Sequence, residues 1–310
     1  MNEIKSAAII GAGALGLLYA EMMKTKLGSN CYFLTDGERY QHIKNGKFTI
    51  NGKNEDFHVE SRENLLTRGA RKPDLILIAV KNHHLEDIVP LITSAVSEKT
   101  IILSVLNGIS SENFLAQHFP QARIIPTVAV GMDAVKVDRK LDYTVSGKLL
   151  IGHSDTKKNN DGLAEISAFF ESCGMVYETP DDIERSLWWK WMINIGVNQV
   201  SAVTGASYGV FHTDRNTQLL MESAMQETIN VAKAAGVDLR DDDIENWYPI
   251  LRSLGPDNKT SMLQDIEARR KTEVEAFSGR LIELAEEYSV DVPVNLTLFR
   301  IIKTKEFLYS

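Results

Sequence analysis

A narrow row of polar side chains on an otherwise apolar segment has the chemistry of a ligand-binding strip. Between residues 187 and 198 the polar side chains are those of Lys190, Asn194 and Asn198. At about 100° of helical rotation per residue these positions lie within an arc of about 80°, and Ser201 extends the row. The pattern predicts a mostly buried helix whose polar strip faces a cleft. An amine and two amides at low dielectric need partners, supplied either by a polar ligand or by other groups of the protein.

A glycine-rich turn at the start of the chain has the spacing of a dinucleotide-binding fingerprint. It follows the apolar run of residues 7–10 and precedes a helical pattern over residues 17–24. In such a turn the first glycine permits a tight bend, the second lets the backbone approach a pyrophosphate, and the third lets the helix pack closely on the strand. The helix N-terminus then favours the negative charge of the pyrophosphate. The predicted cofactor-binding residues are Gly11, Gly13, Ala14, Leu15 and Gly16.

Asp36 ends the next apolar run and bears on the choice of dinucleotide. A carboxylate at this point accepts hydrogen bonds from the adenosine ribose hydroxyls of NAD and repels the 2′-phosphate of NADP. Arg39 lies three residues further on. It either reaches a 2′-phosphate when Asp36 turns away or is a solvated loop charge. The local chemistry therefore favours NAD.

A third group of residues opens a later helix, with the sequence Thr260-Ser261-Met262-Leu263-Gln264-Asp265. Ser261 and Gln264 fit a capping box, in which the two side chains satisfy free backbone N–H groups. A helix N-terminus of this kind also presents N–H groups and a hydroxyl to a substrate carboxylate. Glu273 lies further along the expected helix, where a glutamate without other context is predicted to be a solvent-exposed charge.

The elements that position these residues fall into two domains. Up to about residue 180, apolar runs alternate with helical patterns, which predicts a doubly wound α/β fold with parallel strands. Residues 46–60, with Asn51-Gly52, predict an inserted hairpin, and residues 162–172 predict a helix stopped by Gly174. The predicted strands are residues 7–10, 31–34, 75–80, 101–106, 124–130 and 149–151.

After Asp181 the strand signals nearly vanish and long helical patterns take over. Helices are predicted over residues 183–203, over residues 217–235 ending at Gly236, and from about Ser261 past Arg280. The predicted domains are thus residues 1–181, binding a dinucleotide, and residues 182–310, an all-helical domain for substrate and catalysis.

Composition narrows the classes of function. The 310 residues include 34 basic and 42 acidic side chains, a net charge of −8, which argues against nucleic acid or an anionic membrane surface as partner. No apolar stretch approaches the ~20 residues of a membrane span. The two cysteines, Cys31 and Cys173, are far apart in the sequence, and the seven histidines include no HExxH, so no metal site is expected. A reducing cytoplasm is the expected compartment.

Together the motifs resemble the 2-dehydropantoate 2-reductase (ketopantoate reductase) family over nearly the whole chain. The matching segments are the glycine turn, Val80-Lys81, Asn107-Gly108, residues 187–194 with Asn198, and Ser261-Met262-Leu263-Gln264-Asp265 with Thr272-Glu273. The resemblance implies an N-terminal Rossmann domain, a helical C-terminal domain like that of 6-phosphogluconate dehydrogenase, and a cleft between them. In this family NADPH reduces ketopantoate to pantoate, a step toward pantothenate and coenzyme A.

The resemblance also implies roles for particular residues. Lys190 matches the catalytic lysine that protonates the ketone oxygen, and Glu273 matches the acid that holds the substrate hydroxyl and helps to place the lysine. Asn194, Asn198 and Ser261 match substrate-binding residues. Lys81 and Asn107 match residues on the cofactor side.

Two departures from the family pattern leave alternatives open. Asp36 stands where the family often carries an arginine that grips the 2′-phosphate, and residues 131–147 follow the family pattern poorly. The resemblance implies NADP, whereas Asp36 admits NAD and an NAD-dependent D-2-hydroxyacid dehydrogenase acting on a bulkier 2-keto acid. A homodimer is plausible from the apolar helices of the second domain.

Two other classes of protein fit less well. Gly205-Ala206-Ser207-Tyr208-Gly209 matches the elbow of serine hydrolases, but it follows a predicted helix rather than a strand. The order of a catalytic triad also fails, because no acid lies between Ser207 and the last histidine, His212. A non-catalytic dinucleotide sensor would keep the glycines without needing Lys190, Asn194 and Glu273.

Overall fold

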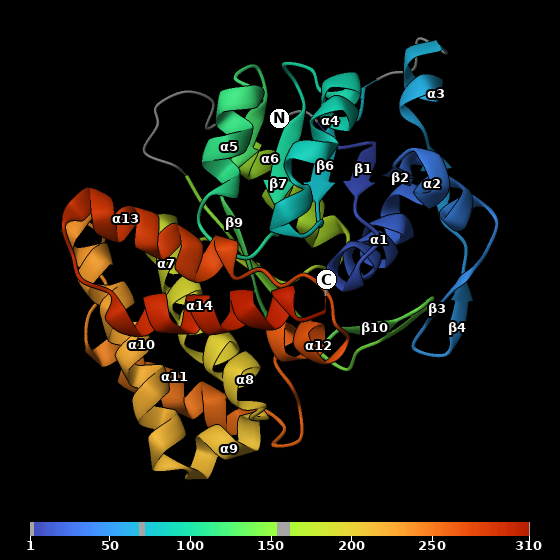
Figure 1. Cartoon of the computed structure of the whole chain (residues 1–310). Helices are drawn as coiled ribbons and strands as arrows, with labels where there is room; N and C mark the ends of the chain where they lie inside the picture. Colours follow the sequence, from blue (N-terminus) through green and yellow to red (C-terminus); the bar gives the residue numbers. More distant parts are fainter. Residues whose placement is uncertain (1–2, 68–71, 154–161, 310) are drawn as a thin grey trace. The chain divides into compact units, whose positions relative to one another are not determined.

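The computed structural model describes residues 3–67, 72–153 and 162–309. Contacts divide the chain into two units (Figure 1). The first comprises Met1–Leu106 and Ser110–Ile183, and the second comprises Asn107–Ile109 and Glu184–Ser310. The short segment Asn107–Ile109, which we had expected in the first domain, thus makes its contacts with the second unit.

The main sheet of the first unit has six parallel strands in the order β5-β2-β1-β6-β7-β8. When only the six strands of this sheet are numbered along the chain, their order is 3-2-1-4-5-6. This is the strand order of doubly wound dinucleotide-binding domains, which confirms the predicted fold class. The strands in sheet order are His58–Glu60, Cys31–Leu34, Ala7–Ile10, Leu75–Ile78, Ile101–Ser104 and Arg123–Ile125.

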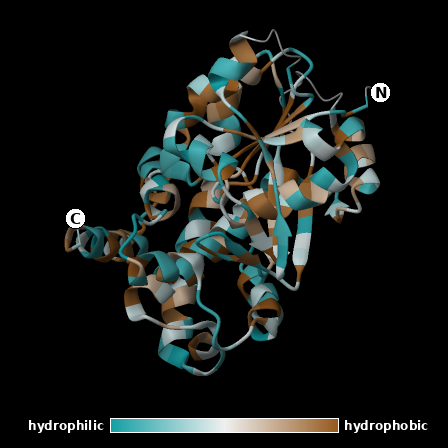
Figure 2. Ribbon diagram, turned by 90° about the vertical axis from the view of Figure 1, so that its right-hand side faces the viewer, coloured by the Kyte–Doolittle hydropathy of each residue, from teal (hydrophilic) through white to brown (hydrophobic). Residues whose placement is uncertain are grey.

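Both faces of this sheet are buried, which explains why its strands are apolar without alternation. In β1, Ala7 and Ile9 belong to one hydrophobic core, while Ala8 and Ile10 belong to another. The strands of the main sheet accordingly appear mostly brown in Figure 2. The helical segments of this unit are α1 Ala14–Leu27, η1 Gly28–Asn30, α2 Gly37–Lys44, α3 Arg62–Thr67, η2 Asn82–His84, η3 Glu86–Ile88, α4 Val89–Ala95, α5 Ser111–His118 and α6 Gly162–Ser172.

Two smaller sheets complete the unit and correct two predictions. The predicted strand over residues 124–130 is two strands, because Pro126 has no N–H with which to continue the ladder. β8 stays in the main sheet, while β9 (Thr127–Met132) pairs with β12 (Ser146–Ile151), which in turn pairs with β13 (Tyr177–Glu178).

The predicted hairpin over residues 46–60 is shorter than expected. β3 (Phe48–Ile50) and β4 (Lys53–Glu55) are antiparallel around Asn51 and Gly52, whose φ values of 46° and 80° allow a tight turn. Residues 58–60 instead form the third strand of the main sheet. The segment 131–147 contributes β10 (Val135–Val137) and β11 (Lys140–Asp142), and β11 pairs with β3. The segment that departs from the family pattern therefore extends the inserted hairpin into a sheet.

The second unit is all-helical in the part of the chain that the structure describes, as predicted. Its segments are α7 Ile183–Ile193, η4 Asn194–Asn198, α8 Gln199–Thr204, α9 Tyr208–Thr213, α10 Arg215–Ala234, α11 Asp242–Ser253, α12 Ser261–Glu267, η5 Glu275–Gly279, α13 Arg280–Tyr288 and α14 Pro293–Phe307. The segments η4 and η5 are π-helical, with wider turns than an α-helix. Among the described residues, no helix is long and apolar enough to cross a membrane.

Two of the predicted long helices are interrupted. The helix over residues 183–203 runs through the π-helical turn η4. The helix expected from Ser261 past Arg280 ends at Glu267, where Arg269 has φ of 51° and the backbone N–H of Arg270 donates to the carbonyl of Asp265 at 2.8 Å. This left-handed end turns the chain away from the helix axis. Glu273 therefore does not lie on that helix.

A nearly buried ion pair joins β8 to α6 and gives a stability prediction. Arg123 Nη1 lies 2.9 Å from Glu165 Oε2, with side chains 12% and 7% exposed. We expect Glu165→Ala to lower the free energy of unfolding by about 3–5 kcal/mol, because it leaves the arginine charge uncompensated. Glu178→Ala, which removes an exposed partner of Lys148, should cost less than about 1 kcal/mol. Equal losses for both variants in urea unfolding would contradict this account.

Candidate active site

Two glycines of the fingerprint are required by the packing of the first unit itself. Gly11 has φ of 107°, and a Cβ there would lie 2.5 Å from the carbonyl oxygen of Ala79. A Cβ at Gly16 would lie 1.8 Å from the carbonyl oxygen of Gly11. These contacts are the tight turn and the close helix–strand packing that the spacing predicts.

Gly13 differs, because none of the described residues requires a glycine there. A Cβ at Gly13 would meet no atom closer than Ala79 O at 3.8 Å, and its φ of −76° is open to any residue. Gly13 is the N-cap of α1, whose first turn has no acidic residue and includes Ala14 and Leu15. The first N–H groups of a helix have no partners within the helix. A glycine without a Cβ beside such N–H groups fits the close approach of the pyrophosphate of a dinucleotide.

Asp36 is held in place beyond the end of β2. It is the N-cap of α2, and its Oδ1 accepts a hydrogen bond of 2.9 Å from the backbone N–H of Arg62. Its Oδ2 lies 3.7 Å from Nε of the same arginine. Arg62, which follows β5, was not among the predicted residues, and no spacing pattern in the sequence links it to Asp36. Arg39 is exposed on α2.

Lys81 lies in the same region of the sheet. It follows β6 and is the N-cap of the short helical turn η2. The chain segments after β1, β2 and β6 all leave the carboxyl ends of neighbouring parallel strands, where doubly wound folds bind their ligands. The fingerprint, Asp36 and Lys81 are thus on the edge of the sheet expected for a cofactor.

In the second unit the predicted polar strip lies on a mostly buried helical segment. Trp191 and Met192 are fully buried, whereas Lys190 and Asn194 are half-buried. Asn198 is 7% exposed, and its Nδ2 donates to Asn194 Oδ1 at 3.2 Å. The two asparagines are the first and last residues of η4, so the wide π-helical turn sets them side by side.

Ser201 does not extend the strip. It is fully buried, and its hydroxyl donates to the carbonyl of Ala206 at 2.6 Å. The prediction for this residue is therefore wrong, because its hydroxyl is satisfied by the backbone that follows α8 rather than directed to a ligand.

The side-chain nitrogen of Asn194, Nδ2, is a buried hydrogen-bond donor without an acceptor among the described residues. A buried donor without an acceptor costs free energy, so such a group in a native protein calls for an explanation. A ligand oxygen at this point would satisfy the N–H.

Glu273 is not the solvated helical charge that its position first suggested. It is half-buried in the bend before η5, and its Oε2 accepts a hydrogen bond of 3.2 Å from Asn107 Nδ2. Its carbonyl accepts from the backbone N–H of Ala276 at 3.0 Å. Trp191, next to Lys190 in the sequence, donates from Nε1 to the carbonyl of Ala276 at 2.9 Å. These contacts bring Asn107, Glu273 and the end of α7 into one packed region of the second unit.

Ser261 lies at the exposed start of α12, and the predicted capping box is wrong by one residue. The N-cap is Thr260, whose hydroxyl accepts from the N–H of Leu263 at 3.2 Å. Gln264 instead donates from its side chain to the carbonyl of Lys259 at 3.1 Å. The hydroxyl of Ser261 is consequently not used as the cap.

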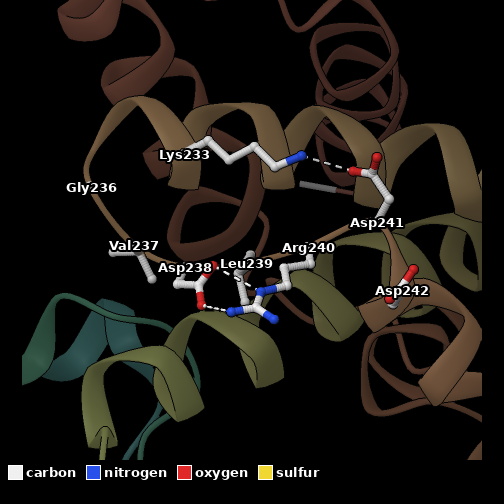
Figure 3. Close-up of a pocket in the computed structure, with 8 residues that line it drawn as sticks. All are labelled: Lys233, Gly236, Val237, Asp238, Leu239, Arg240, Asp241 and Asp242. Atoms are coloured by element: carbon white, nitrogen blue, oxygen red, sulfur yellow. Dashed lines mark hydrogen bonds and ion pairs between the residues drawn. The ribbon is translucent and has the colours of Figure 1, made fainter.

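A hollow elsewhere in the second unit does not include the predicted residues. It is a shallow, open depression of about 530 Å³ beside the turn between α10 and α11 (Figure 3). Its basic side chains are already paired: Lys233 Nζ lies 2.9 Å from Asp241 Oδ1, and Arg240 binds Asp238. The lining residues are Lys233, Gly236, Val237, Asp238, Leu239, Arg240, Asp241 and Asp242.

The hydrolase alternative is excluded by local structure. Ser207 is the N-cap of α9 and follows α8, so no strand leads into the turn as an elbow requires. His212 Nε2 is bound to the carbonyl of Leu251 at 2.8 Å. Within the described ranges, no three His, Cys, Asp or Glu side chains are grouped as metal ligands.

Known proteins match both units. The family model "Ketopantoate reductase PanE/ApbA" matches residues 7–156, and its C-terminal counterpart matches residues 182–306. The 2-dehydropantoate 2-reductase of Nostoc sp. is 30% identical over 308 residues, covering 94% of this chain and 92% of the relative. That of Archaeoglobus fulgidus is 24% identical and covers 98% of this chain and 99% of the relative.

Solved structures share the fold. The dimeric ketopantoate reductase of Staphylococcus aureus has a TM-score of 0.81 at 21% identity, covering 98% of this chain and all (100%) of that chain. A D-mandelate dehydrogenase with NADH and anilino(oxo)acetate has a TM-score of 0.84 at 20% identity, covering 98% and 99%. The family models span most of the sequence, in agreement with the motifs in both units. The chain therefore belongs to the ketopantoate reductase PanE/ApbA family.

Proposed function

We propose that this protein is a nicotinamide-dependent oxidoreductase that reduces the ketone of a 2-keto acid, with ketopantoate as the first substrate to test. The observation that carries the proposal is the amide nitrogen of Asn194, one helical turn after Lys190, which is buried and has no hydrogen-bond partner among the described residues. This donor is suited to a ligand oxygen. Family membership and the relatives named 2-dehydropantoate 2-reductase support the choice of substrate.

The first unit supplies the groups for the dinucleotide. The unstrained position of Gly13 and the N-terminus of α1 fit its pyrophosphate, while Asp36 and Lys81 follow β2 and β6, the two strands that flank β1. When bound, the nicotinamide supplies a hydride, which is two electrons and a proton, to carbon 2 of the keto acid.

The second unit supplies the groups for the substrate. Asn194 and Asn198 bind the keto acid, and Ser261 binds its carboxylate. The Lys190 ammonium donates a hydrogen bond to the ketone oxygen and transfers its proton there as the C=O bond becomes a C–O–H group. The lysine amine then regains a proton from solvent. Glu273, held by Asn107, accepts a hydrogen bond from the substrate hydroxyl and helps to place Lys190.

A panel of 2-keto acids tests this function. The purified protein is mixed with each acid and with NADH or NADPH, and loss of absorbance at the reduced nicotinamide band is followed. We expect ketopantoate to give the highest kcat/KM. A higher value for a bulkier 2-keto acid would identify a D-2-hydroxyacid dehydrogenase, and no oxidation of either cofactor with any acid would favour a dinucleotide sensor.

For the cofactor we propose a preference for NADH over NADPH. The backbone N–H of Arg62 fixes the Asp36 carboxylate beyond β2, so it stays where it opposes a 2′-phosphate. We expect Asp36→Ala to raise the ratio of NADPH to NADH efficiency at least about tenfold, because a like-charge repulsion is removed. Asp142→Ala, at an exposed pair with Lys140, is the matched control. An unchanged ratio in Asp36→Ala, from kinetics and from fluorescence titration of both cofactors, would refute this role.

We also propose that the protein is a cytoplasmic homodimer. A relative with the same fold is dimeric, and both cysteines are free thiols. The molar mass, measured by light scattering as the protein elutes from a size-exclusion column, tests the dimer. A monomeric mass at micromolar concentration would contradict it.

A further inference from the structure

A buried polar network lies beneath the polar strip of the second unit. It consists of Gln199, Ser278 and Asn295, which are all 0% exposed, and Glu227, which is 8% exposed. The four residues come from α8, η5, α14 and α10. Fully buried polar side chains cost free energy unless they are hydrogen-bonded, so their partners show what the network holds.

The amide of Gln199 is the centre of the network. Its Nε2 donates to the backbone carbonyl of Ile195 at 2.8 Å and lies 3.2 Å from Asn295 Oδ1. The hydroxyl of Ser278 donates to Gln199 Oε1 and also lies 3.2 Å from Asn295 Oδ1. Both ends of the Gln199 amide are therefore fixed by neighbours from other elements.

Asn295 and Glu227 anchor this centre to two long helices. Asn295 Nδ2 donates to Glu227 Oε2 at 2.8 Å and to the carbonyl of Ala224 at 3.0 Å. The Glu227 carboxylate also accepts from the backbone N–H groups of Val294 and Asn295, at 2.8 and 2.9 Å. It thereby caps the first turn of α14, where N–H groups have no helical partner and a negative charge is favoured.

The network reaches both π-helical turns of the unit. Ile195, whose carbonyl receives the Gln199 amide, lies inside η4 between Asn194 and Asn198. Ser278 lies inside η5, which begins two residues after Glu273. A π-helical turn replaces the i to i−4 hydrogen bonds of an α-helix with i to i−5 bonds, and it is rarer than the α-helix. The buried amide of Gln199 adds a side-chain donor to a carbonyl of η4 while it is held from η5.

We propose that Gln199 is a positioning residue for the reaction. By binding the Ile195 carbonyl from the buried side, it keeps η4 wide and so keeps the Asn194 amide directed at the substrate. Ser278 and Asn295 fix the orientation of the Gln199 amide, which links η4 to the segment that follows Glu273. The role assigned to Gln199 rests on the proposed function of Asn194 and Asn198.

The test compares Gln199→Leu with a matched control, Thr228→Val. Leucine keeps the volume of the side chain but removes the donor to Ile195. Thr228 is also fully buried, in α10, and its hydroxyl donates to the Ala224 carbonyl at 3.0 Å, so its loss removes a buried hydrogen bond outside the π-helical turns. For Gln199→Leu we expect KM for the keto acid to rise at least tenfold, with KM for the cofactor within twofold of the wild type. Thr228→Val should leave both KM values within twofold of the wild type, even if its melting temperature is lower.

Hydrogen–deuterium exchange gives a readout that does not depend on turnover. In Gln199→Leu the backbone amides of residues 194–200 should exchange at least tenfold faster, while those of Thr228→Val should match the wild type there. If Gln199→Leu does not fold, Ser278→Ala removes one hydrogen bond from the same amide and should shift KM and exchange in the same direction by about threefold. Unchanged KM and unchanged exchange at residues 194–200 in the folded variant would overturn the proposal.

The two hypotheses fail in different ways. If the wild type reduces no keto acid, the proposed function fails, and the exchange at residues 194–200 still decides whether Gln199 holds η4. If the wild type is active and Gln199→Leu behaves like Thr228→Val in both measurements, the role of Gln199 alone is refuted.

Discussion

Replacing Lys190 with alanine is expected to lower kcat for keto acid reduction by about 10²–10⁴-fold, the range of a positioned proton donor. Without the ammonium group, negative charge on the ketone oxygen develops without a nearby cation and the proton must come from water. The Kd of the reduced cofactor should stay within twofold, because all its predicted residues except Asn107 lie in the other unit. Steady-state kinetics with saturating cofactor and a separate cofactor titration measure the two effects.

Lys233→Ala is the matched control for this variant. It removes a lysine of the same unit that is paired with Asp241 on the surface, and it should leave kcat unchanged. If Lys190→Ala keeps most of the wild-type kcat, or if Lys233→Ala loses as much, Lys190 is not the proton donor. A rise in KM with kcat unchanged would instead show that Lys190 binds the substrate equally in the ground and transition states.

The second large effect is expected at the glycine turn, where the same substitution should act in two different ways. Gly13→Ala places a Cβ in ordinary van der Waals contact with the carbonyl oxygen of Ala79, at 3.8 Å, so the free energy of unfolding should stay within about 0.5 kcal/mol while the Kd of the cofactor rises at least about tenfold. Gly16→Ala places a Cβ 1.8 Å from the carbonyl oxygen of Gly11, so it should lower the free energy of unfolding by about 1–3 kcal/mol or more.

Urea unfolding without ligand and fluorescence titration with NADH separate these outcomes. Gly13→Ala that binds cofactor like the wild type would show that no ligand approaches this backbone. A Gly16→Ala variant as stable as the wild type would show that α1 can move away from β1 at little cost. Either result would contradict the roles proposed for these two glycines.

Much of the fold was predictable because its core strands have a strong local pattern. The strands Ala7–Ile10 and Cys31–Leu34 have the predicted bounds, since each is a continuous apolar run between polar residues. The third strand of the main sheet, His58–Glu60, was missed because it is short and carries two polar side chains. Its place depends on pairing with β2, which is a tertiary contact that no local pattern encodes.

The site was predictable to a lesser degree. The spacing of Lys190, Asn194 and Asn198 gave the strip, because helical periodicity places them on one face. The π-helical turn at residues 194–198 and the burial of Ser201 were not predictable, since both depend on packing against other helices. The partners of Asp36 and Glu273, which are Arg62 and Asn107, come from distant parts of the sequence. Spacing rules describe neighbours within an element and say nothing of such pairs.

The assignment of Asn107–Ile109 to the second unit has a consequence for modularity. The chain passes between the units at Leu106, at Ile109 and at Ile183, so no single cut separates them. A fragment that begins at Glu184 lacks the amide that binds Glu273. A chimera that exchanges residues 184–310 between two relatives would combine a Glu273 from one parent with an Asn107 segment from the other. The unit that can be exchanged is therefore the helical segment together with this tripeptide.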